Sequence, residues 1–396
     1  MTEAELFEQI LGIKEIRVDR VDWQEQALHI YCSSIFEETL CPHCLKKRQV
    51  VHQTYERQIR DLPITGKEVY LHLSQRQFYC PDCDRRFNER FNFVAPQRAM
   101  TCRYERYVYE CCKASTIQKV SAQENLVWST VNDICQRGAR QELQERPLSK
   151  VKAVGMDELA IKKGHRDYVT VIVDLERIEI VDILEYREQA KLIGYFKNKG
   201  TEWCEGIDVF CSDMWPGFIN TARAVFPRAT VVVDRFHFFG YLNKAVDGQR
   251  KSLRRQFKDR EELKRLKWAL LKNAENLTPD QTTKRDRAFL LFPELKLIYD
   301  HKEMFRAIFN RNLTRKQGEI ELKKWMEAAR EMNNKYLNTF LYMLNDWKEY
   351  VLNYFAHRVT TSVIEGINNS IKTVKRMGYG FRNFVNFKQR VLISFA

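Results

Sequence analysis

Two aspartates stand at the ends of short β-rich runs in the middle of this chain, and their placement indicates metal chemistry. Asp157 lies at or near the end of one run, VKAVGMDELAI, and Asp213 ends another, IDVFCSDM. If the two runs are neighbouring strands, the carboxylates meet at one edge of a sheet, which is costly unless a cation lies between them. Such carboxylate pairs bind magnesium, and phosphodiester chemistry uses two ions to hold the attacking and leaving oxygens.

A third carboxylate completes such a site, and it normally comes from a helix packed on the sheet. Glu365 fits, because it lies in VIEGINNSIKTVKR, which has the pattern of a helix. It is also the last acid of the chain, since residues 366–396 contain six Lys and Arg and no Asp or Glu. We therefore expect Asp157, Asp213 and Glu365 to be the catalytic residues and the ligands of two Mg²⁺ or Mn²⁺ ions.

Each of these acids also has a plain structural interpretation. Asp157 would then be a turn acid at a strand end, Asp213 the N-cap of a helix that begins near Pro216, and Glu365 a solvated helix residue. Glu158, which follows Asp157 directly, is an alternative first ligand.

The acid-free tail after Glu365 is suited to DNA. Its cations lie along one or two helix turns, where they can contact phosphates, and its asparagines can reach phosphates or base edges. Glycines on both sides of Tyr379 let the backbone approach a DNA strand, with an aromatic ring available for stacking. The DNA contacts predicted in this tail are Asn368, Asn369, Lys372, Lys375, Arg376, Tyr379 and Arg382.

Two Cys-Pro-x-Cys motifs near the N-terminus predict a zinc site. The first contains Cys41 and Cys44, the second contains Cys80 and Cys83, and the sequence between them reads as two β-like stretches joined by a Pro/Gly turn. Each motif can direct two thiolates at one ion, and structural zinc takes four ligands in a tetrahedron. The other cysteines lack paired spacing and are expected in packing.

The order of elements around the aspartates predicts an RNase H-like core. From Val151 the pattern gives three antiparallel strands, a helix, a strand, a helix and a further strand, 229–237. That order builds a mixed sheet with helices on both faces, in which the strand of Asp213 lies beside the strand of Asp157. Residues 241–355 are almost wholly helical in pattern, and 278–281 and 314–317 read as capping boxes that begin helices at Thr278 and Thr314. The core is therefore an α/β fold split by an all-helical insertion.

Residues 103–137 have the outline of a helix-turn-helix. A short helix around 117–122 is followed by a turn and by a second helix with Val127, Val131 and Ile134 on one face. The second helix would offer Ser129, Thr130 and Asn132 to a DNA major groove. The alternative is a three-helix spacer. The polar stretch 138–150 has no periodicity and is predicted to be a linker.

The composition agrees with a folded protein that binds a polyanion. The chain has 396 residues, 44% of them hydrophobic, which is enough for more than one core. Its net charge of +14 favours nucleic acid as partner. No apolar run is long enough for a membrane span, and the acidic N-terminus is unlike a secretory signal. The 11 cysteines are therefore expected to be reduced in a cytoplasm.

Several blocks of the sequence resemble insertion-sequence transposases of the ISL-three type. The blocks are GMDELAIKKGHRDYVTVIVDLE, CSDMWPGF, FPRATVVVDRFH and SVIEGINNSIKTVKRMGYGFRNFVNFKQR. The resemblance covers roughly residues 35–395. It implies a DDE enzyme with an N-terminal zinc-binding segment and a helix-turn-helix, and with Asp157, Asp213 and Glu365 as its triad. Asp234 and His237 match an Asp-x-x-His signature, which implies either a supporting Asp–His hydrogen bond or a direct role.

The predicted organisation has five parts. They are a zinc-ribbon-like module (1–100), a helix-turn-helix with linker (101–150), the first part of the core (151–240), the helical insertion (241–355) and the last catalytic helix with the basic tail (356–396).

The expected function is DNA transposition in bacteria, in the cytoplasm and on the nucleoid. The enzyme would bind terminal inverted repeats, cleave DNA and join the 3′ end to target DNA, and it would form a homo-oligomer on DNA. One alternative is a DNA-binding regulator with an inactive core, which predicts the loss of at least one acid. Another is a structure-selective nuclease, which would not need two recognition modules.

Overall fold

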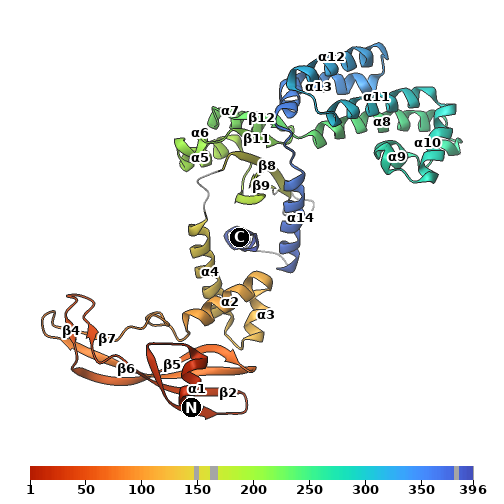
Figure 1. Cartoon of the computed structure of the whole chain (residues 1–396). Coiled ribbons are helices and arrows are strands. Elements are labelled where there is room, and N and C mark those ends of the chain that lie inside the picture. The colour runs from red at the N-terminus through yellow and green to blue at the C-terminus, as the bar shows by residue number, and fades with distance from the viewer. Residues whose placement is uncertain (147–150, 161–167, 379–382, 396) are drawn as a thin grey trace. The chain divides into compact units, whose positions relative to one another are not determined.

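The computed structural model describes residues 1–146, 151–160, 168–378 and 383–395. The chain divides into two compact units, Met1–Glu145 and Arg146–Ala396, which are described separately (Figure 1). No helix among the described residues has the length and apolarity needed to cross a membrane.

The first unit begins with helix α1 (Glu3–Leu11) and a five-stranded sheet. The strands are β1 Ile16–Trp23, β2 Ala27–Ser34, β5 Val51–Ile64, β6 Lys67–Cys80 and β7 Arg85–Asn88. The order is β1-β2-β6-β5, with β7 also paired to β6. Alternate residues of β2, such as Leu28 and Ile30, are buried against α1, as the period of a half-buried strand requires. Two short strands, β3 (Thr39–Leu40) and β4 (Lys47–Arg48), flank the first cysteine motif.

Three helices complete the first unit. They are α2 (Cys102–Ala114), α3 (Ile117–Gln123) and α4 (Trp128–Glu145). Threonine side chains cap the first two, Thr101 for α2 and Thr116 for α3.

Two predictions about α4 were wrong. Val127 precedes the helix and its side chain is 70% exposed, because a residue at the cap position leaves the buried stripe. Residues 138–145 are helical rather than a linker. Packing holds this part of α4, since Gly138 lies against the ring of Tyr109 and Glu142 accepts hydrogen bonds from Tyr109 and Lys113.

The second unit is built on a five-stranded mixed sheet. The strands are β8 Ala153–Ala160, β9 Tyr168–Asp174, β10 Glu179–Leu184, β11 Val209–Ser212 and β12 Thr230–Val233. The order is β10-β9-β8-β11-β12, with β8, β9 and β10 antiparallel and β11 and β12 parallel to β8. The predicted neighbourhood of the first and fourth strands is thus confirmed.

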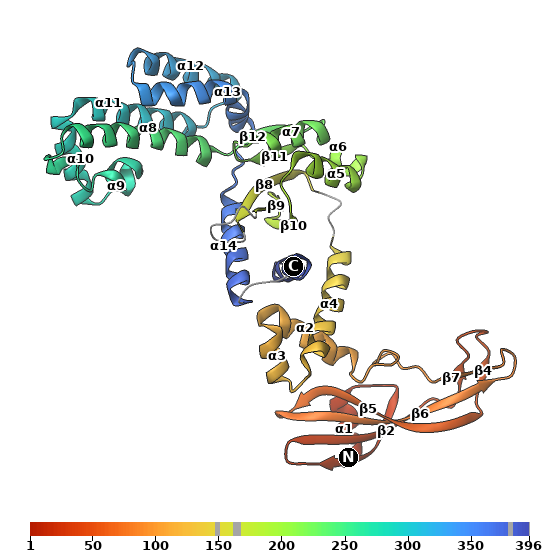
Figure 2. The ribbon, with the colours of Figure 1, turned by 180° about the vertical axis from the view of Figure 1, so that it is seen from behind.

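Helices lie against both faces of this sheet (Figures 1 and 2). Val154 and Met156 of β8 pack in one core with Phe196 of α5 (Gln189–Lys199) and Phe218 of α7 (Pro216–Val225). Gly155, on the opposite face of β8, lies against Ile364 of α14 (Ser362–Met377). The short α6 (Thr201–Glu205) follows α5, and the last helix, α15 (Phe384–Ser394), contacts β10.

A helical segment separates β12 from α14. Its helices are α8 Arg235–Gln256, α9 Lys267–Leu271, α10 Pro279–Leu291, α11 Pro293–Asn310, α12 Arg315–Glu331 and α13 Lys335–His357, with 3₁₀ turns η2 Glu261–Leu263 and η3 Ala274–Asn276. Capping boxes start α10 at Thr278 and α12 at Thr314, as the sequence predicted. The segment starts earlier than expected. The predicted strand 229–237 ends at Val233, because Asp234 caps α8 and turns the chain into a helix.

Candidate active site and zinc site

Asp157 and Asp213 lie next to each other on neighbouring strands of the mixed sheet. Asp213 directly follows the end of β11, but Asp157 lies inside β8, three residues before its end at Ala160, and not at the predicted strand end. β8 and β11 are parallel neighbours with Met156 opposite Ser212, so each aspartate is the next residue along its strand. Helix α7 begins at Pro216 with Trp215 in the cap position, and Asp213 therefore does not cap this helix.

Both carboxyl groups are poorly hydrated. Burial raises the pKa of Asp157, and the charge of Glu158 adds to this rise, whereas the Glu158 N–H and His237 oppose it. Burial also raises the pKa of Asp213 to about 6, with His237 opposing and Asp157 adding to the shift. Among the described residues, Asp213 Oδ1 is buried without a hydrogen-bond donor, and neither aspartate is ion-paired with Lys or Arg. The two acids thus form a negatively charged pair that needs a cation.

Glu158 has a cation of its own. Its two carboxylate oxygens accept hydrogen bonds from Arg187 Nη1 at 2.9 and 3.0 Å. The Arg187 guanidinium also lies 4.9 Å from the ring centre of Tyr168 and 5.8 Å from that of Trp215. Because Glu158 is already neutralised, Asp157 is the better candidate for a metal ligand.

Helix α14 crosses the sheet face that carries Asp157. A side chain at Gly155, two residues earlier on the same face, would come within 2.5 Å of Ile364, so glycine permits this close approach. One turn later, Asn368 Nδ2 donates to Asp157 Oδ2 at 2.8 Å. The Asn368 side chain is buried, and within the described part of the chain its Oδ1 has no hydrogen-bond partner.

Glu365 lies in the first turn of α14, three residues before Asn368, and its side chain is exposed. Among the described residues, it does not join the two aspartates in a group whose ligand atoms all lie within 4.8 Å of one another. The structure therefore brings Asp157, Asp213 and Asn368 together. The sequence predicted Asn368 as a DNA contact and missed its contact with Asp157, although its helical spacing from Glu365 was a signal.

Asp234 fastens the start of α14 to the end of β12. Its buried carboxylate accepts one hydrogen bond from Phe236 N at 3.2 Å and another from the Thr361 hydroxyl. Thr361 immediately precedes α14. The partner of Asp234 in this arrangement is thus Thr361 rather than the predicted His237, whose backbone N–H donates to the Asp234 carbonyl at 3.1 Å.

The other predicted DNA contacts differ in exposure. In α14, Asn369, Lys372 and Arg376 are exposed and Lys375 is half-buried. Tyr379 and Arg382 lie outside the described residues.

At the start of α4, the exposure of the predicted DNA contacts also varies. Ser129 is exposed, whereas Thr130 and Asn132 are half-buried. The buried side of α4 is formed by Val131 and Ile134.

The four cysteines of the paired motifs converge. The Sγ atoms of Cys41, Cys44, Cys80 and Cys83 all lie within 4.8 Å of one another. The sulfurs of Cys41 and Cys83 are 4.0 Å apart and those of Cys44 and Cys80 are 3.6 Å apart. Zinc–sulfur bonds of about 2.3 Å in a tetrahedron require sulfur separations of about 3.8 Å. The cluster therefore fits a zinc ion.

Arg48 supports thiolate character in this cluster. Its Nη2 lies 2.9 Å and its Nε 3.3 Å from Cys80 Sγ. Burial alone would raise the pKa of Cys80, but the hydrogen bonds from Arg48 and the neighbouring groups lower it to about 6. Donors to a ligand sulfur are typical of the groups that surround a structural metal.

The family model for the ISL3 transposase domain, described as "Transposase", matches residues 154–391. The chain belongs to this transposase family. The model for the zinc-finger of transposases IS204/IS1001/IS1096/IS1165 matches residues 37–83, and the helix-turn-helix domain of transposase family ISL3 matches 89–139. These two matches cover the cysteine cluster and helices α2 to α4 of the transposase.

Two curated relatives are transposases as well. The chain is 29% identical over 405 residues to the transposase for insertion sequence element IS1001 of Bordetella parapertussis, covering 100% of this chain and 99% of the relative. It is 26% identical over 289 residues to the transposase for insertion sequence element IS1557 of Mycobacterium tuberculosis, covering 65% of this chain and 63% of that relative. The expected family and its transposase function are thus confirmed.

Proposed function

We propose that this transposase cuts DNA at the terminal inverted repeats of its insertion sequence and joins the 3′ ends to target DNA. Asp157, Asp213 and Glu365 would be the catalytic residues and would hold two Mg²⁺ or Mn²⁺ ions. When bound, these ions would activate the attacking water or 3′-hydroxyl and stabilise charge on the leaving oxygen, so that no side chain need serve as general base.

The main support for this proposal is the pair of aspartates, whose negative charges lie close together. Asp157 and Asp213 are side by side, poorly hydrated and, within the described residues, without a Lys or Arg partner. Asp213 Oδ1 also lacks a donor there. Such an arrangement is costly until a cation binds, and carboxylate oxygens are the donors that Mg²⁺ and Mn²⁺ prefer. The donor set therefore fits a divalent ion.

Neighbouring side chains would prepare this site. Asn368 would fix the rotation of the Asp157 carboxylate through its 2.8 Å hydrogen bond. Arg187 would keep the Glu158 carboxylate away from the pair, because its Nη1 donates to both carboxylate oxygens.

The start of α14 would present Glu365. The Thr361–Asp234 hydrogen bond anchors this start, and Glu365 lies one turn from Asn368, which already contacts Asp157. A change of side-chain rotamer, or a small shift of the helix when ions bind, would complete the triad.

The architecture supports the same assignment. Residues 151–240 and 356–396 would form an RNase H-like core, and the mixed sheet with its two parallel final strands supports this assignment. Residues 241–355 would be its helical insertion. A structural Zn²⁺ on the four cysteines would hold the N-terminal module, 1–100, in shape.

DNA would be bound by two groups of residues. Ser129, Thr130 and Asn132 of α4 would read the terminal repeat in the major groove. Lys372, Lys375 and Arg376 would contact phosphates, together with Asn369, Tyr379 and Arg382. On DNA the chain would act as a homo-oligomer, in the cytoplasm and on the nucleoid.

The test is to incubate the purified full-length chain with duplexes that carry its own element ends and to map the nicks. Nicks at the element ends in Mg²⁺ or Mn²⁺, and none in EDTA, are expected. Nicks that are independent of metal ions, or none at all with DNA that the protein binds, would overturn the proposal.

A further inference from the structure

A cavity opens where the helical segment joins the mixed sheet. It has a volume of about 680 Å³ and is lined by the first turns of α8, by residues 271–276 and by α11. This volume lies within the range of about 300–1,000 Å³ that accommodates small organic ligands. The contacts described above do not involve this cavity.

The chemistry of the cavity wall suits a nucleotide. Phe236 and Phe239 supply aromatic surface, and the Phe236 side chain is 59% exposed although it lies only two residues after the buried Asp234. Several amide side chains can read the edge of a base: Asn243, Asn273, Asn276 and Asn310. Four of the lining residues are cationic and one, Glu275, is acidic.

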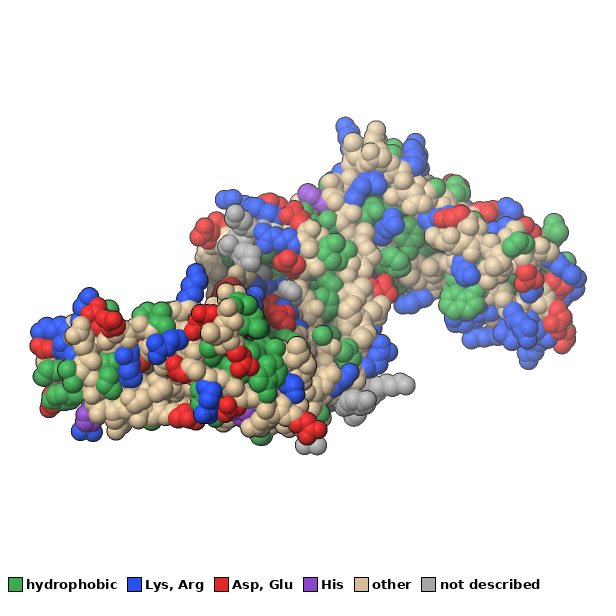
Figure 3. Space-filling view, turned by 60° about the horizontal axis from the view of Figure 1, so that its bottom comes forward, with side chains coloured by type: hydrophobic (Ala, Val, Ile, Leu, Met, Phe, Trp, Pro, Cys, Tyr) green, Lys and Arg blue, Asp and Glu red, His purple; other side chains and the backbone are tan. Residues whose placement is uncertain are grey.

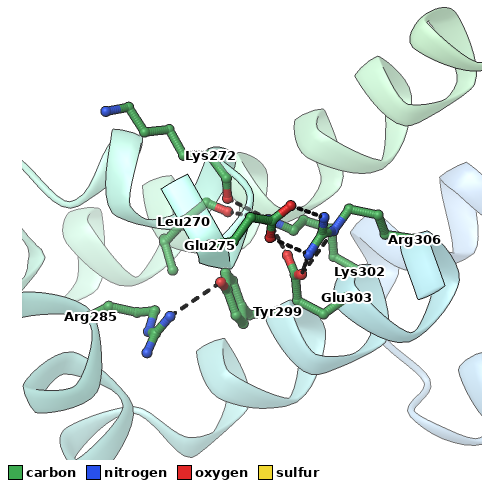
Figure 4. A network of polar contacts seen from close by, with 8 residues as sticks. All are labelled: Leu270, Lys272, Glu275, Arg285, Tyr299, Lys302, Glu303 and Arg306. Atoms are coloured by element: carbon green, nitrogen blue, oxygen red, sulfur yellow. Dashed lines mark hydrogen bonds and ion pairs between the residues drawn. The ribbon is translucent and has the colours of Figure 1, made fainter. Parts of the chain in front are cut away.

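The floor of the cavity is made rigid by a polar network (Figure 4). The buried Lys302 ammonium donates to the carbonyls of Leu270 and Lys272 at 2.8 and 3.2 Å and pairs with Glu303 at 2.9 Å. Arg306 binds Glu275 through two hydrogen bonds of 2.6 and 2.8 Å. These contacts bind α11 to the segment after α9 and leave little charge on the floor.

Two cations of the wall retain their charge for a ligand. Among the described residues, neither Arg235 nor Lys272 has an acidic ion-pair partner. The Lys272 side chain extends away from the network in Figure 4. The adjoining surface is also basic, and Figure 3 shows Lys and Arg side chains gathered on the helical segment. The stretch that precedes and begins α9 carries the exposed cations Lys258, Arg260, Lys264, Arg265 and Lys267, of which Lys264 is paired with Glu261.

The cavity begins close to the candidate active site along the chain. Ser212 pairs with Val233 in the parallel strands β11 and β12, so Asp213 and Asp234 leave the sheet at the same edge. Arg235 and Phe236 follow Asp234 directly. A nucleotide close to a phosphodiester at the aspartates could therefore reach Phe236.

We propose that this cavity binds one unpaired nucleotide of the DNA near the cleavage position, with its base on Phe236 and its phosphates near Arg235 and Lys272. This inference depends on one part of the proposed function, namely that the DNA end is held at the two aspartates. The base would come either from an already single-stranded end or from a pair that is opened on binding.

The test uses 2-aminopurine as a fluorescent base in two DNA probes, with the full-length chain in buffer without added Mg²⁺ or Mn²⁺. One probe is a blunt duplex with the analogue in its terminal pair, and the other carries it in a short single-stranded overhang. Stacking on Phe236 should quench the fluorescence of at least one probe, and affinity for the overhang probe should exceed that for an unlabelled blunt duplex. Quenching of the overhang probe alone identifies a single-stranded end as the source, and quenching of both identifies pair opening.

Phe236→Ala should abolish the quenching and weaken binding of the quenched probe about tenfold, since stacking of one base on an aromatic side chain is worth this much. Phe236→Trp should retain both the quenching and the affinity for the quenched probe. Trp268→Ala is the matched control, because Trp268 is 60% exposed on α9 and does not line the cavity.

Unchanged quenching and affinity in Phe236→Ala, or equal losses in Trp268→Ala, would overturn the inference. Because cleavage needs Mg²⁺ or Mn²⁺ and neither is added, this result is independent of the proposed chemistry. If the chain captures the base but never cuts DNA, the proposed function is contradicted and the inference about the cavity still holds.

Discussion

At the scale of single residues, the candidate site consists of two acids whose proximity is unfavourable without a cation, together with a few neighbouring polar side chains. Asp157 has an amide donor in Asn368, whereas Asp213 Oδ1 has none among the described residues. The supports come from distant parts of the chain, since Asn368 is 211 residues from Asp157. Sequence reasoning could find Asp213 from a strand end and Asp157 from its β-rich run, although Asp157 lies inside its strand. It could not see the contact with Asn368, which depends on how α14 docks.

Asn368 is expected to act as a positioning residue for Asp157. Asn368→Ala should lower the rate of metal-dependent cleavage by about 10- to 100-fold, as the loss of a partner of a metal ligand does. Mn²⁺ affinity should fall as well, whereas DNA binding should be retained. Cleavage kinetics and Mn²⁺ titration check this. Ser370→Ala, at an exposed position two residues later, is the control, and equal cleavage rates in both variants would contradict the role of Asn368.

Asp213→Asn should stabilise the metal-free protein at neutral and alkaline pH. The folded-state pKa of about 6 exceeds the ordinary value of 3.8, so the folded protein holds this proton more tightly than the unfolded chain does. Ionisation of Asp213 therefore lowers the free energy of unfolding. The full decrease is present above about pH 6, and no decrease is present below about pH 3.8. At about pH 8 the substitution should raise the free energy of unfolding by up to about 3 kcal/mol.

Thermal unfolding in buffer without added Mg²⁺ or Mn²⁺ across this pH range checks the prediction. The gain should shrink as the pH falls through 6 toward 4. Asp208→Asn, at an exposed position, should show no such trend. A gain that is independent of pH would mean that burial of charge is not the cause.

At the scale of elements, some helix boundaries follow from local sequence signals, whereas others depend on tertiary contacts. Thr278 and Thr314 begin helices as predicted, because a capping box is satisfied within four residues. The end of α4 was missed because packing of Gly138 on Tyr109, rather than any local signal, keeps 138–145 helical. The start of α8 was also missed, although Asp234 is a common N-cap residue. A run of valines before it favoured continuation of the strand.

The cysteine module is expected to contain one zinc ion per chain and to need it for folding. Cys80→Ser should lose the ion and unfold the N-terminal module, since structural zinc contributes directly to folding free energy. Metal analysis and protease sensitivity of residues 37–88 check this. Cys102→Ser, an exposed cysteine outside the cluster, should keep both the metal and the fold. A well-folded wild-type preparation without zinc would contradict the assignment.

The exposed cations of α14 are expected to contact DNA phosphates. Lys372→Ala with Arg376→Ala should weaken DNA binding about equally for all sequences and reduce the salt dependence by a slope of about 1 per lost contact. The control removes the same charge from α12 with Lys316→Ala and Lys323→Ala, both exposed. Binding isotherms at several salt concentrations check this. If both pairs change the slope equally, bulk charge rather than α14 is responsible.

At the scale of the whole molecule, the chain places two recognition modules ahead of a sheet whose edge carries acids. The family matches follow this division, with the zinc-finger and helix-turn-helix models on residues 37–139 and the transposase model on 154–391. The sequence predicted this order because cysteine pairs, helical period and strand period are local patterns. The position of Glu365 relative to the aspartates depends instead on the docking of α14, and its membership in the triad stays a prediction.

The most direct test of the central claim replaces each acid by its neutral isostere and maps cleavage of the element ends in Mg²⁺. Asp157→Asn, Asp213→Asn and Glu365→Gln should each abolish cutting and joining while the DNA is still bound. Because the three would act as one unit, a double variant should be little worse than a single one. Glu158→Gln should retain substantial activity, because Arg187 already holds this carboxylate. Normal cutting by all three neutral variants would contradict the account, and loss in Glu158→Gln with cutting by Asp157→Asn would move the first ligand by one residue.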